Sequence, residues 1–221
     1  MKRIKYWTSM NIIRLKTFNR VNLRNRIDRF RLNNNDFSII SQNCIGGFMC
    51  HDLGIKFNSP TINLYFDAND FVKFLENMDY YLACKLRFEN NYDFYPIGYL
   101  DDLKIHFVHY SDCNQANLKW EERKKRLNKE NLFIIMTDRD GCTFELLERF
   151  DKLPYKNKII FTSKRYEHIK SSIWVNKYRN QNTVGYLHEI HSLSGKRGYN
   201  INFDYVSWLN ESVIYDKDKS L

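Results

Sequence analysis

Short apolar runs alternate with segments of helical periodicity from residue 37 onward. The runs have the length and composition of buried strands, whereas the segments between them place apolar residues three or four positions apart. The predicted strands are Phe37–Ile40, Thr61–Phe66, Cys84–Phe88, Leu103–Tyr110, Leu132–Met136, Ile159–Thr162 and Thr183–Leu187. The predicted helices are Phe48–Leu53 closed by Gly54, a helix capped by Asp67, Cys113–Leu127 capped by Ser111 or Asp112, Thr143–Phe150 and Arg165–Ser172. This alternation predicts an α/β fold, a three-layer α/β/α domain with a mostly parallel or mixed sheet.

The first 35 residues follow a different pattern, in which apolar residues lie at helical spacing among arginines. These apolar residues are Ile12, Leu15, Phe18, Val21, Ile27 and Phe30. We therefore divide the chain into a basic amphipathic segment, residues 1–35, and a single α/β domain, residues 36–221. The segment is either a helix that packs on the domain and shows its charges to water, or a helix that lies on an anionic membrane surface.

Nearly all of the net charge belongs to that segment. The chain carries a formal charge of +9, and residues 1–31 hold ten Lys or Arg side chains against Asp28 alone. The remaining residues are therefore neutral overall. Because nucleic-acid binding requires a basic surface on the folded body, this distribution disfavours nucleic acid as a partner.

The composition indicates a cytosolic protein. The chain has 221 residues, of which 43% are hydrophobic, and it contains no run of the roughly 18 apolar residues that cross a bilayer. Its first residues lack the apolar core of a signal peptide. The five cysteines are odd in number and form no CxxC pair, so we expect reduced thiols. We predict a cytoplasmic location, with contact to the inner face of the membrane if the basic segment binds lipid.

The turn after the first predicted strand is the first candidate site. Ser41, Asn43, Gly46 and Gly47 provide donors and bare backbone that suit a phosphate or an acyl oxyanion. Cys44 in the same turn is a candidate nucleophile. His51, a further candidate ligand contact, lies about 10 Å from Cys44 if a helix joins them, so it can act as its base only if the glycines fold the chain back. A packed thiol in a structural loop is the alternative.

The aspartate turn after the strand Leu132–Met136 is the second candidate. Asp138 and Asp140 are similar to the paired aspartates of the haloacid-dehalogenase phosphatases, and Thr162 and Lys164 are residue types that this class uses to hold phosphate. Only 24 residues separate Asp138 from Thr162, and no acidic pair for magnesium follows. Asp140 as a helix N-cap, or as a contact to a sugar or nucleotide, is the other interpretation.

A histidine pair on a later strand completes the candidates. His106 and His109 are an odd number of positions apart, so on a regular strand they point to opposite faces and cannot share a metal ion. His109 lies near the carboxyl end of its strand and is the better candidate for a base. We predict no metal site, and no cofactor follows from the sequence.

Six blocks resemble one bacterial family in the same order, the domain of unknown function numbered 1919. The blocks are FSIISQNCIGGFMCHDLGIKFNSPTINLYF, NDFVKFLENMDYYL, YPIGYLDDLKIHFVHY, KWEERKKRLNKENLFIIMTDRDGC, LPYKNKIIFTSK and FDYVSWLN. The resemblance covers about residues 36–210. Members are commonly labelled exopolysaccharide or capsule biosynthesis proteins, so it implies a three-layer α/β fold and a setting among glycan-assembly enzymes. It implies no reaction, and Ile45 stands where the family has an aromatic residue.

We therefore expect a glycosyl- or acyltransferase that acts on a surface-glycan precursor. Its partners would be a sugar nucleotide, an acyl donor or a glycan precursor. Asp138, Asp140, His109 and Cys44 are the candidate catalytic residues, and we expect the turn after the first strand and the aspartate turn to face a common hollow. A non-catalytic, membrane-associated scaffold of glycan assembly and a phosphatase are the alternatives.

Overall fold

The chain forms two compact units in a computed structural model that describes residues 2–201 and 203–217, with side chains described from residue 10 to residue 211 except 202. The first unit contains the described residues up to 35, residues 48–56 and the described residues from 186 onward. The second contains residues 36–47 and 57–185. Residues 48–56 and the described residues from 186 onward therefore cluster with the N-terminal helices.

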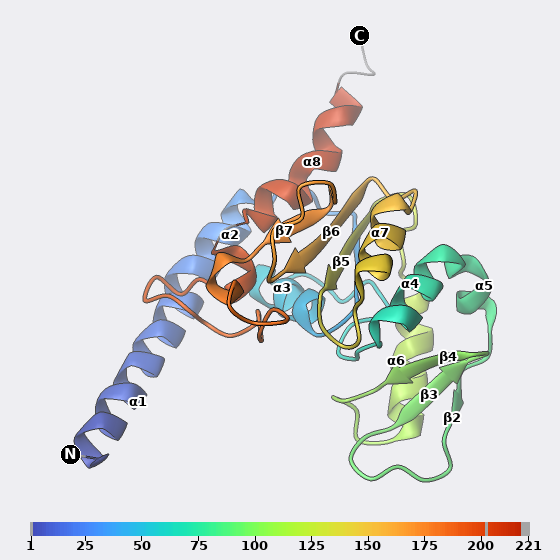
Figure 1. Cartoon of the computed structure of the whole chain (residues 1–221), viewed down its shortest axis with the longest axis horizontal. Coiled ribbons are helices and arrows are strands. Elements are labelled where there is room, and N and C mark those ends of the chain that lie inside the picture. Colours follow the sequence, from blue (N-terminus) through green and yellow to red (C-terminus); the bar gives the residue numbers. More distant parts are fainter. Residues whose placement is uncertain (1, 202, 218–221) are drawn as a thin grey trace. The chain divides into compact units, whose positions relative to one another are not determined.

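A four-stranded parallel sheet forms the centre of the second unit (Figure 1). Its strands lie in the order β1 (Ser38–Ser41), β5 (Leu132–Thr137), β6 (Asn157–Thr162) and β7 (Ser172–Trp174). Every pairing is parallel, with Ile40 beside Ile134 and Ile135 beside Ile159. The first three strands are almost completely buried, as expected for a parallel sheet. The predicted α/β class is confirmed.

Amphipathic helices supply much of the core around this sheet. They are α4 (Ala68–Glu76), α5 (Met78–Ala83) and α7 (Phe144–Lys152). α7 begins where Thr143 Oγ1 accepts a hydrogen bond from the backbone N–H of Leu146, and it buries Leu147 and Phe150. α4 packs against α7 and buries its own phenylalanines, Phe71 and Phe74. The helical spacing of apolar residues therefore predicted the buried faces of both helices.

A second, antiparallel sheet lies in the same unit. Its strands are β2 (Arg87–Phe88), β3 (Ile97–Leu100) and β4 (Leu103–His106), and α6 (Cys113–Lys124) follows in the chain. Asp112 caps α6 by accepting a hydrogen bond from Gln115 N. Trp120 of α6 is buried and lies edge-on to Phe107. A Cβ atom on Gly98 would lie 2.7 Å from the Phe107 ring, so this strand position requires glycine.

Three predicted elements are wrong. Thr61–Phe66 forms no strand: its end makes a single bridge, in which Tyr65 and His106 exchange backbone hydrogen bonds. Residues 165–172 form turns and not a helix, and they lead into β7. The predicted strand Thr183–Leu187 is irregular. A short 3₁₀ helix, η2 (Asn176–Tyr178), follows β7 instead.

The first unit is helical. It contains α1 (Lys2–Asn19), η1 (Arg20–Arg24), α2 (Asn25–Arg31), η3 (Gly198–Asn200) and α8 (Tyr205–Lys217), together with most of α3 (Ile45–Leu53), which begins in the second unit. α2 packs against α8. η1 is a π turn that joins α1 to α2 without a break. α3 ends as predicted at Gly54, which has a φ of +69° that favours glycine.

Charged groups occupy the centre of the first unit. Asp52, at 1% exposure, forms ion pairs with Arg20 and Arg197 and accepts hydrogen bonds from Tyr199 Oη at 3.0 Å and Asn25 Nδ2 at 3.4 Å. A second carboxylate, that of Asp28, is equally buried. It forms an ion pair with Arg24 in the preceding turn and accepts a hydrogen bond from the Tyr205 hydroxyl at 2.9 Å.

Burial alone would raise the pKa of the Asp52 carboxyl. Hydrogen bonds and charge from Arg197 and Arg20 more than offset this effect and lower that pKa to about 2. Asp52 is therefore ionised at neutral pH and serves as the counter-ion of two buried guanidinium groups. Among the described residues, no helix combines the length and the hydropathy that crossing a bilayer requires.

Candidate functional site

Loops from three parallel strands meet at the carboxyl edge of the sheet in the second unit. Gln42 to Cys44 follow β1, Asp138 to Asp140 follow β5, and Ser163 and Lys164 follow β6. In open α/β sheets, ligands bind at this edge because strand ends and helix starts converge there. The first two of these loops are the two candidate turns that the sequence predicts.

Hydrogen bonds join the first two loops directly. Gln42 Oε1 accepts from both the backbone N–H and the hydroxyl of Thr137, each at 2.9 Å. Asn43 Nδ2 donates to the same hydroxyl at 3.2 Å. The turn after the first strand and the aspartate turn therefore lie at the same edge of the sheet and contact each other.

The thiol of Cys44 contacts an imidazole. Its Sγ atom lies 3.1 Å from Nε2 of His109, although 65 residues separate them in the chain. β4 ends at His106, so His109 lies in the loop beyond the strand and is exposed. His51 is in the last turn of α3 with a side chain that is 74% exposed, and its nearest ionic partner is Asp52. Sequence reasoning thus found both members of the pair without predicting the contact.

The environment of Cys44 keeps its thiol protonated. Burial raises the pKa of Cys44, and a hydrogen bond from its own backbone N–H offsets this only in part. α3 begins at the next residue, which places the positive end of a helix dipole beside the sulfur. A neutral thiol next to an imidazole is a proton-transfer pair, since the imidazole can accept the proton as the sulfur attacks.

The predicted anion cradle is occupied by the loop's own groups. Ser41 Oγ accepts from the backbone N–H of Gly46, and Asn43 Oδ1 accepts from that of Ile45, each at 3.2 Å. A Cβ atom on Gly46 would lie 2.8 Å from the Cβ atom of Ser41. A Cβ atom on Gly47 would lie 2.8 Å from the side-chain oxygen of Asn63. The serine, the asparagine and the two glycines therefore shape the loop that presents Cys44.

Asp138 holds loops together, and both of its carboxylate oxygens accept hydrogen bonds from neighbouring loops. One oxygen accepts from the backbone N–H and the hydroxyl of Ser163, at 2.7 and 2.8 Å, and the other accepts from Val184 N at 2.7 Å. Thr162 is fully buried and donates its hydroxyl to the carbonyl of Lys164, whose side chain is exposed. This arrangement argues against Asp138 as a phosphatase nucleophile and against a phosphate held by Thr162.

Asp140 differs from Asp138 in its backbone conformation and in the environment of its carboxyl group. Its backbone is left-handed, with a φ of +56°, and its carbonyl accepts a hydrogen bond from Ala68 N at 2.8 Å. Burial raises the pKa of the Asp140 carboxyl, the charge of Arg139 offsets part of this increase, and the charge of Asp67 adds to it. The interpretation of Asp140 as a helix cap is wrong, because Thr143 caps α7. A carboxyl group with a raised pKa at the end of a strand is a candidate acid, base or sugar contact.

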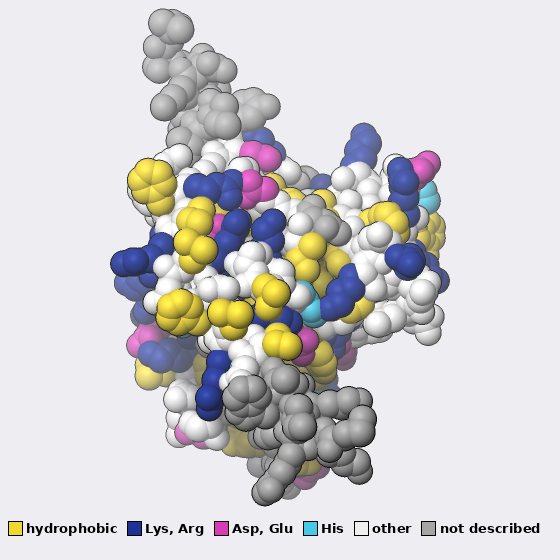
Figure 2. Space-filling view, turned by 90° about the vertical axis from the view of Figure 1, so that its left-hand side faces the viewer, with side chains coloured by type: hydrophobic (Ala, Val, Ile, Leu, Met, Phe, Trp, Pro, Cys, Tyr) yellow, Lys and Arg dark blue, Asp and Glu magenta, His cyan; other side chains and the backbone are white. Residues whose placement is uncertain are grey.

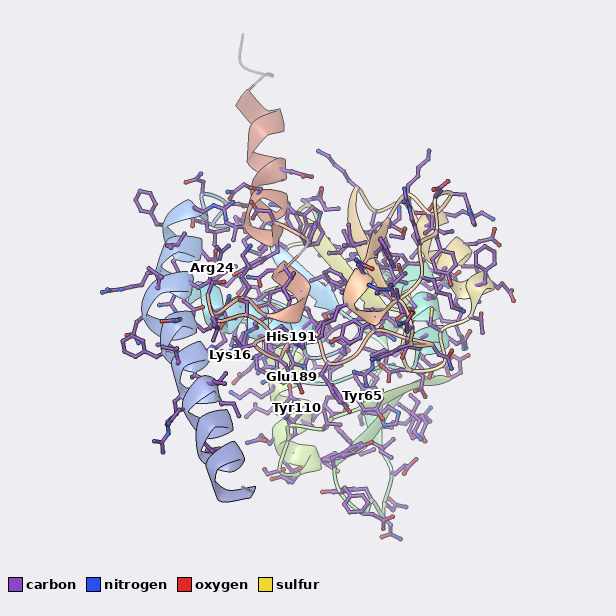
Figure 3. All side chains as sticks on the ribbon, turned by 60° about the vertical axis from the view of Figure 1, so that its left-hand side comes forward. Lys16, Arg24, Tyr65, Tyr110, Glu189 and His191 are labelled. Atoms are coloured by element: carbon purple, nitrogen blue, oxygen red, sulfur yellow. The ribbon has the colours of Figure 1, made fainter. Side chains whose placement is uncertain are left out.

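Four side chains that sequence reasoning did not select lie beside these loops. His106 is buried, its ring stacks on that of Tyr65 with centroids 4.2 Å apart, and its Nδ1 lies 3.3 Å from the hydroxyl of Tyr95. Its Nε2 lies 3.8 Å from Asp67 and has no hydrogen-bond partner among the described residues. Figure 3 labels Tyr65 in this group. Asp67 reads as a helix cap in the sequence, so only the bridge between Tyr65 and His106 reveals the cluster.

The cluster adjoins the Cys44 loop, because Phe66 N donates to Gln42 O at 2.9 Å. The edge therefore combines a thiol–imidazole pair with two carboxylates, an aromatic ring and a buried imidazole. In the part of the chain that the structure describes, no group of three or more His, Cys, Asp or Glu side chains is arranged to hold a metal ion. This set of groups suits proton transfer and the recognition of hydroxyl groups.

A cavity of about 800 Å³ lies elsewhere in the same unit, near the start of β5 and the end of α7. Its ionic side chains pair with one another, Arg149 with Glu76 and Lys129 with Asp79. It contains no thiol and no imidazole. The groups able to carry out chemistry lie instead at the carboxyl edge of the sheet.

Comparison with known protein families identifies one family for this chain. The family model described as "Domain of unknown function (DUF1919)" matches residues 15–210. An "Uncharacterized protein" of Haemophilus influenzae is 45% identical over 188 residues, which cover 85% of this chain and 91% of that protein. Cys44 and His109 both lie within the matched residues. Since the family model spans most of the chain, the protein belongs to the DUF1919 family.

Proposed function

We propose that the protein is an acyltransferase that carries the acyl group on Cys44 and passes it to a hydroxyl group of a surface-glycan precursor. The observation that supports this function is the 3.1 Å contact between Cys44 Sγ and His109 Nε2 at the carboxyl edge of the sheet. A thiol and an imidazole in contact are the minimum set for covalent acyl transfer.

The reaction has two balanced steps. In the first, Nε2 of neutral His109 accepts the thiol proton while the sulfur attacks the acyl carbonyl carbon, and the leaving group departs with that proton. In the second, the hydroxyl oxygen of the acceptor attacks the thioester carbonyl carbon while His109 accepts the hydroxyl proton. The Cys44 sulfur then leaves and takes that proton from His109. Because burial keeps the Cys44 thiol protonated, the first step requires a base, and His109 is in position to act as one.

The neighbouring cluster suits a sugar as the acceptor. The carboxylates of Asp67 and Asp140 accept hydrogen bonds from hydroxyl groups, and the face of the Tyr65 ring offers an apolar surface for the C–H face of a sugar. The resemblance to proteins labelled for exopolysaccharide or capsule biosynthesis supports a surface-glycan precursor. We place the reaction in the cytosol, in accordance with the five free cysteines.

The experiment follows the acyl group on the protein. The purified chain is mixed with a panel of short-chain acyl-coenzyme A donors, and the intact mass is measured with and without later addition of hydroxylamine, which cleaves thioesters. We expect a thioester adduct on the wild type, none on Cys44→Ala, and at least 100-fold slower formation on His109→Gln. Cys113→Ala is the matched control, because Cys113 is also half-buried and unbridged.

An adduct that persists in Cys44→Ala, or the absence of any adduct with every donor, would contradict acyl transfer. Unfolding midpoints of each variant must match that of the wild type for the comparison to hold.

Glycosyl transfer is the second candidate, and the raised pKa of Asp140 beside Asp67 favours it. In that case Asp140 would take the proton of the acceptor hydroxyl and the donor would be a sugar nucleotide. Thermal stabilisation by nucleotide sugars that Asp140→Asn abolishes and Cys44→Ala retains would select this reaction over acyl transfer. If neither variant changes glycan output in cells, the protein is a non-catalytic scaffold.

A further inference from the structure

The N-terminal helix of the first unit buries polar side chains and exposes apolar ones. Arg20, Asn25 and Asp28 are at most 3% exposed. The large apolar side chains of the same stretch face solvent at 41% to 89% exposure, namely Ile12, Leu15, Phe18, Leu23, Ile27 and Phe30. A helix on the surface of a globular protein normally shows the reverse distribution.

The π turn explains how three polar residues reach one face. Residues five positions apart lie on opposite sides of an α-helix, but a π turn brings them onto the same side. η1 lies between Arg20 and Asn25, so both side chains point into the unit, where both contact Asp52. Asp28 follows three positions later on the same face.

The buried contacts fix the rotation of the helix. Turning it to bury the apolar side would remove Arg20 from Asp52 and Asp28 from Tyr205, and so leave buried carboxylates without their partners. The orientation with the apolar side outward is therefore held by buried ion pairs and hydrogen bonds. An apolar stripe of this length, about 30 Å for 20 residues, exceeds the scattered exposure that a soluble surface normally shows.

The charges on the exposed side are all of one sign. Arg14 and Arg26 are exposed, and Asp28, the single acidic residue between residues 10 and 31, is buried. Figure 2 shows hydrophobic and basic side chains side by side on the face that carries the N-terminal helices, and Figure 3 labels Lys16 and Arg24 on them. A second copy placed against this face would bring arginines together without carboxylates between them.

We propose that this face, defined by the six apolar side chains above and by Arg14 and Arg26, lies on a membrane surface that contains anionic lipids. Apolar side chains would enter the boundary between headgroups and acyl chains, and the arginines would contact lipid phosphates. The helix would lie in the plane of the surface, in accordance with the finding that no described helix is suited to cross a bilayer. This site is independent of the chemistry proposed at the sheet edge.

The test uses the full chain in sedimentation with vesicles of phosphatidylcholine alone and of phosphatidylcholine mixed with phosphatidylglycerol. We expect strong binding to the mixed vesicles and weak binding to the neutral ones. Arg14→Gln with Arg26→Gln should weaken binding on the order of 20-fold, since each basic side chain contributes about a five-fold gain at an anionic surface. Phe18→Ser with Leu23→Gln should weaken it at least ten-fold.

Matched controls come from the second unit, where Phe94 and Leu118 are equally exposed. Phe94→Ser with Leu118→Gln should leave binding unchanged, as should Lys85→Gln with Arg87→Gln. Equal binding to both kinds of vesicle, or binding that is unaffected by Phe18→Ser with Leu23→Gln, would overturn the proposal. A dimer in light scattering that the same double variant dissolves, without vesicle binding, would assign the face to a second copy and overturn it as well.

Discussion

The two units have opposite interiors. The second unit is built around one continuous apolar cluster that includes Phe66, Phe74, Trp120 and Phe150. The first unit places two carboxylates and two guanidinium groups at its centre, with Asp52 between Arg20 and Arg197. An apolar cluster loses stability in proportion to the atoms removed, whereas an ionic centre fails when one partner is lost. The comparison therefore predicts different responses to mutation and to acid.

The largest effect should come from removing the central carboxylate. Asp52→Ala removes the carboxylate that Arg20 and Arg197 share, so that Arg197 loses its ion-pair partner and Arg20 keeps only the 3.7 Å pair with Asp28, which should cost about 3–5 kcal/mol of unfolding free energy. Urea unfolding measures the total, and hydrogen exchange should locate the loss in peptides of the first unit. Asp102→Asn, which breaks an exposed ion pair with Lys73, is the control and should cost no more than about 1 kcal/mol. A similarly small cost for Asp52→Ala would show that the ionic centre does not hold the unit.

A truncation in the apolar cluster should have the next largest effect. Leu147→Ala removes a side chain that is 2% exposed on α7, and it should cost about 2–5 kcal/mol. Hydrogen exchange should now increase in β5 and β6 and not in η3. Uniform exchange across both units would mean that they unfold as one, and would remove the basis for the comparison.

Acid should affect the first unit through Asp52. The pKa of this carboxyl is lowered to about 2 in the folded state, so the stability it contributes is complete above the unfolded value near 4 and is lost as the pH falls towards 2. The loss should be on the order of 2 kcal/mol. Unfolding midpoints at decreasing pH should fall more steeply for the wild type than for Asp52→Asn. Parallel slopes for the two proteins would contradict the lowered pKa.

The smallest effect should appear at the candidate site. Asp140 has a left-handed backbone that glycine adopts more easily, so Asp140→Gly should stabilise the second unit by up to about 1 kcal/mol. Any catalytic contribution of the carboxylate would be lost in the same variant. Asp101→Gly, at another left-handed position between β3 and β4, is the matched control and should leave activity unchanged. A loss of stability in Asp140→Gly would mean that its carboxylate contributes to the fold.

Local signals in the sequence predicted the parts of the fold that depend on neighbours in the chain. The apolar runs identified β1, β5 and β6, and the pattern from Thr143 to Phe150 identified α7. Residues 165–172 have an alternation compatible with a helix. Pairing with β6, however, makes the chain from Ser172 onward a strand, β7. The bridge between Tyr65 and His106 likewise depends on a distant partner. Pairing between distant segments is therefore what the sequence left open.

The same distinction applies to the candidate site. Cys44 and Asp140 could be chosen because each follows a predicted strand, and His109 because it lies near the carboxyl end of one, where loops reach the edge of a sheet. Their contacts could not be predicted, because the Cys44–His109 pair joins loops 65 residues apart. Asp138 looked equally suitable in the sequence, and only its three hydrogen bonds to Ser163 and Val184 show that its oxygens are occupied.

The π turn sets the rotation between the two halves of the N-terminal helix. If residues 20–24 wound as a regular α-helix with no change in length, the residues before them would be turned by about 100° relative to those after them. Arg20 and Asn25 could then no longer reach the same carboxylate. Deleting one residue between them would instead leave them four positions apart, a spacing that shares one face of an α-helix. The wide turn is therefore what accommodates the extra residue, and substitutions that force α-helical winding there would do more harm than the loss of that residue.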